Sequence, residues 1–204
     1  MATRNILTDG ERTLSKKSRE VTDFNKRLHI LLDDMRETLI EANGLGLAAP
    51  QVGVLRRVAL IVIPVAEEEN PESSDTDIDG GILEDLESMV NSDYENIVEL
   101  INPEIIDSSG EQSGSEGCLS VPGVYGLVTR PEFVTVRARD RNGKIFELEV
   151  NEIAARAVCH EIDHLNGVLF TSVAERILSE EELAEMRAER QNEDSTKDEE
   201  EKSE

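Results

Sequence analysis

The sequence predicts an α+β fold in which antiparallel β-sheets pack around a central helix that carries a His-Glu-x-x-His motif. Residues 151–166 contain no proline or internal glycine, and their apolar positions recur at the spacing of a helical face. Stretches rich in β-branched residues, with the alternation typical of strands, occur at residues 58–63, 97–101, 133–139 and 145–150. We therefore expect strands to surround this one helix.

Local signals at the ends of segments predict the other elements. Residues 23–43 form a predicted helix, which Asp23 can cap and Gly44 can end. The last two strands form a predicted hairpin, because Asn142-Gly143 between them tolerates positive φ at both central positions of a tight turn. Asn151 and Glu152 suit the start of the central helix, and Gly167 suits its end.

The chain of 204 residues is long enough for one domain with a core and too short for two. We expect a single catalytic domain over residues 1–178, interrupted by an acidic inserted loop at residues 66–96. Residues 179–204 are predicted to form an acidic C-terminal helix and a disordered tail. The helix would start at the capping box that Ser179 makes with Glu182.

The net charge of −24 lies mostly in two segments, since residues 66–96 carry −12 and residues 179–204 carry −8, which leaves −4 for the rest. Direct nucleic-acid binding through a basic face is not expected, because these segments repel phosphate. The longest apolar run, residues 58–65, is far shorter than the roughly 20 residues of a membrane-spanning helix. We therefore expect no membrane partner.

The first residues show neither the apolar core of a signal peptide nor the Arg-rich pattern of a transit peptide, so the expected location is cytoplasmic. Nothing indicates an oxidising compartment. The two cysteines, Cys118 and Cys159, are therefore expected to be reduced thiols.

The strongest chemical signal is the run from His160 through Glu161 to His164. Two histidines four residues apart lie on one face of a helix and can reach a single metal ion, and the glutamate after the first can act as a base. Ile153 and Ala157 continue the stripe of the two histidines, so both imidazoles should face the interior. Arg156 and Asp163 are expected on the solvent side. An isolated histidine more often has a structural role, which is our interpretation of His29.

Two imidazoles leave a third ligand to be found. Phe170 occupies the position of a third histidine in one type of metallohydrolase and cannot coordinate a metal. Glu182 or Glu185 could close the site as in another type, although both belong to an acidic segment. Cys118, beside Gly117, is the remaining soft ligand. Cys159 adjoins His160 and points about 100° away around the helix, so we interpret it as a structural thiol.

Three segments together resemble the motifs of the peptide deformylase family: residues 44–51 (Gly-Leu-Gly-Leu-Ala-Ala-Pro-Gln), residues 116–120 (Glu-Gly-Cys-Leu-Ser) and residues 160–164 (His-Glu-Ile-Asp-His). The resemblance spans Arg4 to Leu178. It implies that Cys118, His160 and His164 bind one divalent ion, which is Fe²⁺ in many members and can be replaced by Zn²⁺, Ni²⁺ or Co²⁺.

The resemblance also implies the reaction, which removes the N-formyl group from the N-terminal formyl-methionine of newly made polypeptides and releases formate. Hydroxide from the metal-activated water attacks, and Glu161 acts as general acid and base. The metal, the Gln51 side chain and the Leu119 N–H would hold the oxyanion. The substrate-binding residues would be Leu45, Gly46, Ile153 and Ala157.

Two departures from the family pattern bear on partners. Tyr125 stands where many relatives have arginine, and the tail is acidic where relatives that dock on ribosomes have a basic helix, so transient ribosome association is an open expectation. Two other functions are compatible with parts of the sequence. A His-Glu-x-x-His metallopeptidase would not need Cys118, and a non-catalytic deformylase-like binding protein would not need Glu161 and Gln51.

Overall fold

The computed structural model describes residues 2–64, 96–179 and 181–183. The helices are α1 (Lys26–Glu41), η1 (Ala49–Val52), α3 (Glu152–Asn166) and η3 (Phe170–Ser172). The strands are β1 (Gly46–Ala48), β2 (Val58–Val62), β3 (Ile97–Ser109), β4 (Gln112–Cys118), β5 (Val121–Arg130), β6 (Phe133–Arg139), β7 (Ile145–Asn151) and β8 (Arg176–Ile177). No helix within these residues is both long enough and apolar enough to span a bilayer.

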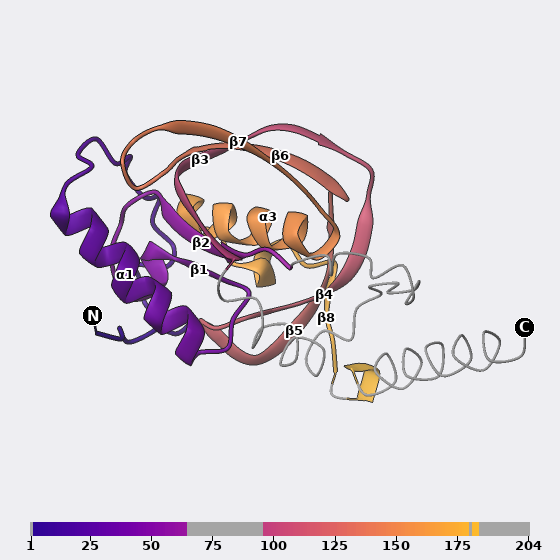
Figure 1. Cartoon of the computed structure of the whole chain (residues 1–204). Coiled ribbons are helices and arrows are strands. Elements are labelled where there is room, and N and C mark those ends of the chain that lie inside the picture. Colours follow the sequence, from indigo (N-terminus) through magenta and orange to yellow (C-terminus); the bar gives the residue numbers. More distant parts are fainter. Residues whose placement is uncertain (1, 65–95, 180, 184–204) are drawn as a thin grey trace, which may run out of the picture.

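Two antiparallel sheets enclose the central helix, as predicted. The larger sheet has the order β1-β2-β3-β6-β7 and the smaller has the order β4-β5-β8. Figure 1 shows α3 lying between β3, β6 and β7 on one side and β4 and β5 on the other. Because sheets cover it on both sides, α3 buries residues around most of its circumference.

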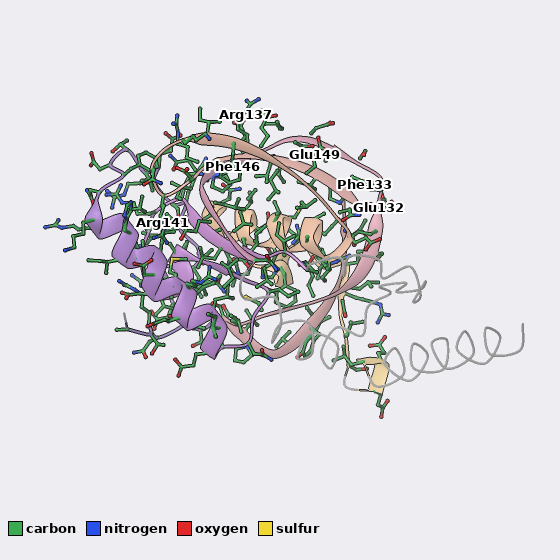
Figure 2. The ribbon with its side chains drawn as sticks, viewed as in Figure 1. Glu132, Phe133, Arg137, Arg141, Phe146 and Glu149 are labelled. Atoms are coloured by element: carbon green, nitrogen blue, oxygen red, sulfur yellow. The ribbon has the colours of Figure 1, made fainter. Side chains whose placement is uncertain are left out.

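The inner face of the larger sheet packs on α3 through one apolar cluster, which includes Ile61, Leu100, Val136 and Val158. A second cluster joins α1 to β1 and β2, with Leu32, Met35 and Leu39 fully buried. The outer side of β6 and β7 faces solvent, and Figure 2 shows Arg137 and Glu149 there, away from α3. This alternation is typical of an antiparallel sheet with one solvated face.

The first helix differs from the prediction at both ends. It begins at Lys26, and its cap is Asn25, whose side chain accepts hydrogen bonds from the N–H groups of Arg27 and Leu28. Asp23 was therefore the wrong cap, because Asn25 lies directly before the first turn. The helix ends at Glu41, two residues before the predicted end at Asn43, which has a φ of 51°.

The predicted hairpin of β6 and β7 is present, with Arg139 paired to Ile145. Its turn spans residues 140–144 and is longer than a two-residue connection. Within it, the Asp140 carboxylate accepts hydrogen bonds from the N–H groups of Asn142 and Lys144. Among residues 140–144, all of which the structure describes, only Gly143 has a positive φ. Positive φ at both Asn142 and Gly143 was therefore a wrong expectation.

The hairpin turn also anchors α1. His29 Nε2 lies 2.8 Å from the main-chain oxygen of Arg141, and the Arg141 guanidinium pairs with Asp33 and Glu99. His29 thus makes a structural contact. At the other end of the chain, the capping box of Ser179 and Glu182 is formed. The predicted acidic loop, apart from Asn96, and the helix and tail beyond residue 183 lie outside the described residues.

Candidate metal centre

One thiol and two imidazoles converge between the smaller sheet and α3. The ligand atoms of Cys118, His160 and His164 all lie within 4.8 Å of one another. Cys118 Sγ is 3.2 Å from His164 Nε2, and the two imidazole rings are 4.9 Å apart at their centroids. The structure thus brings Cys118 next to two histidines that lie 42 and 46 positions after it in the sequence.

Local backbone geometry aims these side chains. His160 and His164 are one helical turn apart on α3, so both project from the same face. Cys118 is the last residue of β4 and pairs with Val121, the first residue of β5, so Leu119 and Ser120 form the turn between the strands. The Ser120 N–H lies 3.4 Å from Cys118 Sγ and can donate to it. The turn therefore directs a main-chain hydrogen-bond donor at the sulfur.

Glu116 is a buried residue in contact with His160, and the sequence analysis gave it no role. It is 4% exposed, and its Oε2 accepts a hydrogen bond from His160 Nδ1 at 3.0 Å. Arg130 donates to both carboxylate oxygens, at 2.9 and 3.0 Å, and also to Asp163 at 2.7 Å. Burial raises the pKa of Glu116, but the hydrogen bonds from His160 and Arg130 outweigh burial and lower it to about 2.

A simple pattern could have indicated Glu116. Residues two apart in a regular strand point to the same side, and although the register shifts between Glu116 and Cys118, both still contact the histidines of α3. The contact with His160 engages Nδ1, so Nε2 is the ring nitrogen available to coordinate a metal. A carboxylate that accepts from the far nitrogen is the usual support of a metal-ligating histidine.

The solvent-side assignment of Arg156 and Asp163 was wrong. Arg156 is 6% exposed and donates to Glu116 Oε1 at 3.0 Å and to the main-chain oxygen of Val128 at 2.9 Å. Asp163 is half-buried and pairs with Arg130. The physical reason is that β4 and β5 cover the face of α3 that would otherwise meet water.

Gln51 lies on η1, with its side chain turned toward the cysteine. The Ala48 N–H donates to Gln51 Oε1 at 2.7 Å, which fixes the amide so that its nitrogen points the other way. That nitrogen, Nε2, donates to Ser120 Oγ at 3.2 Å and lies 3.7 Å from Cys118 Sγ. The amide donor is therefore directed at the cluster of ligand atoms.

Glu161 is buried beside the predicted ligands. It is 3% exposed, and its Oε2 has no hydrogen-bond partner among the residues that the structure describes. Burial raises the pKa of Glu161 to about 7, and the nearby carboxylates of Glu116 and Asp163 add to the rise against the opposing effect of His160. A Cβ on Gly46 would lie 2.8 Å from Glu161 Cδ, so only glycine leaves room for this carboxylate.

The electrostatics of the cluster favour a cation. Burial lowers the pKa of His160, but its hydrogen bonds with Cys118 and Glu116 and the charge of Glu161 outweigh burial and raise the pKa to about 10. Burial and the neighbouring His160 lower the pKa of His164 to about 3. The negative groups around His160 would equally stabilise a metal ion.

The other predicted residues lie as follows. Leu45 and Leu119 pack against the cluster between α1 and the larger sheet, and Ala157 is buried against that sheet from α3. Ile153 is half-buried in the first turn of α3.

The remaining candidates have other contacts. Phe170 stacks on the His160 ring with centroids 6.0 Å apart. Glu182 accepts a hydrogen bond from Ser179 and forms an ion pair with Arg176, and Glu185 lies outside the described residues. Both cysteines are free thiols, and burial raises the pKa of Cys159 to about 11.

Comparisons with known proteins point to one family. The family model described as polypeptide deformylase matches residues 3–179. Peptide deformylase from Alkaliphilus metalliredigens (strain QYMF) is 48% identical over 171 residues, which cover 84% of this chain and 96% of that protein. Peptide deformylase 1 from Bacillus subtilis (strain 168) is 44% identical over 186 residues, which cover 91% of this chain and 99% of that protein.

A solved structure has the same architecture. Class I type b peptide deformylase from Acinetobacter baumannii, bound to Met-Ala-Ser, is 32% identical, with a TM-score of 0.67, and the match covers 84% of this chain and 98% of that one. Sequence and fold thus agree over nearly the whole described chain. The chain therefore belongs to the polypeptide deformylase family, the metal-dependent enzymes that remove the N-formyl group from newly made polypeptides.

Proposed function

We propose that Cys118, His160 and His164 hold the single divalent ion of this enzyme and that Glu161 is its general acid and base. The observation that carries this proposal is the convergence of three ligand atoms within 4.8 Å of one another, next to a buried carboxylate with an unpaired oxygen. The residues fit an ion because a thiolate and two imidazoles are a known donor set for divalent transition metals. The hydrogen bond from His160 Nδ1 to Glu116 adds the expected support.

A divalent ion bound there would lower the pKa of water and polarise the formyl oxygen. We assign Fe²⁺ as the native ion, in line with the family resemblance. Zn²⁺, Ni²⁺ and Co²⁺ are substitutes that the same donor set accepts.

Glu161 moves the proton. Its carboxylate takes a proton from the attacking water and delivers it to the departing amine, so that water and the formylated chain become formate and a free N-terminus. A pKa of about 7 suits both steps, because the group gains and loses a proton readily near neutral pH. Gly46 leaves the space in which the carboxylate lies.

Two donors of this chain would hold the developing oxyanion. The Gln51 amide nitrogen is already oriented by the bond from the Ala48 N–H to its oxygen, which reduces the cost of ordering it during the reaction. The Leu119 N–H is the second donor that we propose. It belongs to the turn that follows Cys118.

The substrate is the formyl-methionyl end of a nascent polypeptide. We propose that Leu45, Gly46, Ile153 and Ala157 line the slot for the methionine side chain. Tyr125, at the position where many relatives have arginine, lies against Gly117, since a Cβ on Gly117 would be 2.8 Å from its ring.

We assign the reaction to the cytoplasm, and transient association with the ribosome follows from the substrate.

Formate release from formyl-Met-Ala-Ser by the metal-loaded protein tests the proposal. Glu161→Gln should keep its metal and lose about 10²- to 10⁴-fold in kcat, because it cannot accept the proton. Cys118→Ser should lose metal and activity together. A Cys118→Ser protein with full metal content and activity would instead point to a site that does not use this thiol.

A further inference from the structure

Arg156 is a buried arginine to which the proposed mechanism gives no role. It lies on α3 one turn before His160, and only 7% of its side chain is exposed. Burying a charged group costs desolvation free energy, and apolar replacements of buried ion pairs are often neutral or stabilising. Stability alone therefore gives little reason for an arginine at this position.

The contacts of Arg156 link the helix of the histidines to the strand of the cysteine. Its Nη1 donates to Glu116 Oε1 on β4 and to the Val128 oxygen on β5, and its Nη2 donates to the Gln112 oxygen at 3.3 Å. A Cβ on Gly114 would lie 3.2 Å from Arg156 Nη2, so this glycine of β4 leaves room for the guanidinium. One side chain thus fixes α3 against both strands.

The two oxygens of Glu116 have different partners. Oε1 accepts from Arg156 and from Arg130 Nε, whereas Oε2 accepts from His160 and from Arg130 Nη2. Arg130 also pairs with Asp163, so it is shared between two carboxylates. With Arg156 removed, Oε1 would keep only Arg130, and the carboxylate could rotate and draw Oε2 away from the ring.

We propose that Arg156 is a positioning residue of the metal centre, which acts through Glu116 to hold the His160 ring with Nε2 toward the other ligands. This inference rests on the ligand set proposed above. Arg156 touches neither the ion nor the substrate, and its effect is to keep one imidazole in the orientation that coordination requires.

Cobalt affinity, measured by chelator competition on the full-length protein, tests the proposal. Arg156→Met should bind Co²⁺ about 10- to 100-fold more weakly, with a changed visible spectrum of the bound cobalt, and Glu116→Gln should show a similar loss. In the double variant, the loss should stay within about twofold of that of Glu116→Gln alone, because both changes break one connection. Losses that multiply would overturn the proposal, as would an unchanged affinity of Arg156→Met.

Further variants separate this question from folding and from the ligand set. Arg137→Met removes an exposed arginine on the outer side of the larger sheet and should leave cobalt affinity unchanged (Figure 2). If Arg156→Met does not fold, Arg156→Lys decides: lysine lacks the fork that reaches several oxygens, so parental affinity would overturn the proposal. His164→Ala tests the proposed ligand set, because a His164→Ala protein with the cobalt affinity of the parent would refute that set.

Discussion

Two buried glutamates flank the histidines of α3, and their surroundings are opposite. Glu116, on the side of β4 and β5, accepts hydrogen bonds from two arginines and one imidazole. Glu161, on the side of β1, faces Gly46 and has an oxygen without a partner in the described part of the chain. Hydrogen bonds hold the pKa of Glu116 at about 2 against burial, whereas burial raises the pKa of Glu161 to about 7.

The difference between the two carboxylates shows how the two sides of α3 can have separate roles. A fully paired carboxylate keeps a fixed charge and a fixed position, which suits the support of a ligand. A buried carboxylate without donors is costly to ionise, and so it can take up and release a proton near neutral pH. The side of Glu116 should therefore control structure and metal affinity, and the side of Glu161 should control turnover.

The largest expected effect concerns the stability of the Glu116 side. Arg130→Met leaves Glu116 and Asp163 without their main partner, and removing one member of a buried pair typically costs about 3–5 kcal/mol. We expect the free energy of unfolding to fall by this amount. Urea denaturation of the metal-free protein measures it.

Arg137→Met is the matched control, because it removes an arginine whose pair with Glu147 is about half exposed. Such surface pairs contribute about 0–1 kcal/mol. Equal losses of stability in the two variants would contradict the distinction between a buried network and a surface pair.

The next effect concerns turnover on the Glu161 side. Gly46→Ala would place a methyl group against the Glu161 side chain and displace the carboxylate. Because a displacement of about 1 Å in a catalytic group can cost about 10²-fold, we expect kcat to fall by that factor. Steady-state deformylation measures it.

Gly10→Ala supplies the control for this glycine. Gly10 has a φ of 97° and no atom within 4 Å of its added Cβ, so the change strains the backbone without touching the site. It should cost about 1–3 kcal/mol of stability and leave kcat as it was. Full activity in Gly46→Ala would show that Glu161 tolerates the displacement.

The sequence predicts the Glu161 side better than the Glu116 side, for a physical reason. Helical spacing aligns His160, Glu161 and His164 within one short segment, so local information is enough. Strands β4 and β5 were not predicted, because glycines at positions such as 114 and 126 weaken the strand pattern. Their pairing and the cover that they give to α3 depend on contacts made in three dimensions.

Arg156 shows the consequence for a single residue. A charged residue beside an apolar helical stripe is usually solvated, and the prediction followed that rule. Here the partner carboxylate is 40 residues away along the chain, on a strand that the sequence analysis did not identify. By contrast, the first helix was predicted in kind, and only its ends shifted, with the cap at Asn25 instead of Asp23 and the last residue at Glu41.

The two thiols of the chain provide a smaller test. After the metal is removed by a chelator, Cys118, which is half-buried, should react with iodoacetamide at pH 8 in the folded protein. Cys159 should stay unmodified over the same time, because burial shields it and raises its pKa to about 11. Peptide mass spectrometry locates the label. Protection of Cys118 by added Co²⁺ would support its role as a metal ligand. Labelling of Cys159 before Cys118 would contradict the burial of Cys159.

The smallest expected effect concerns the Gln51 amide, which we propose as a donor to the oxyanion. Ser120 is fully buried, and its hydroxyl accepts a hydrogen bond from Gln51 Nε2 at 3.2 Å. Ser120→Ala removes that acceptor, while the bond from the Ala48 N–H still orients the amide. One neutral hydrogen bond contributes about 0.5–1.5 kcal/mol, so kcat/KM should change by roughly 2- to 10-fold with cobalt affinity unchanged. A loss as large as that of Gly46→Ala would mean that Ser120, rather than Ala48, determines the orientation of the Gln51 amide.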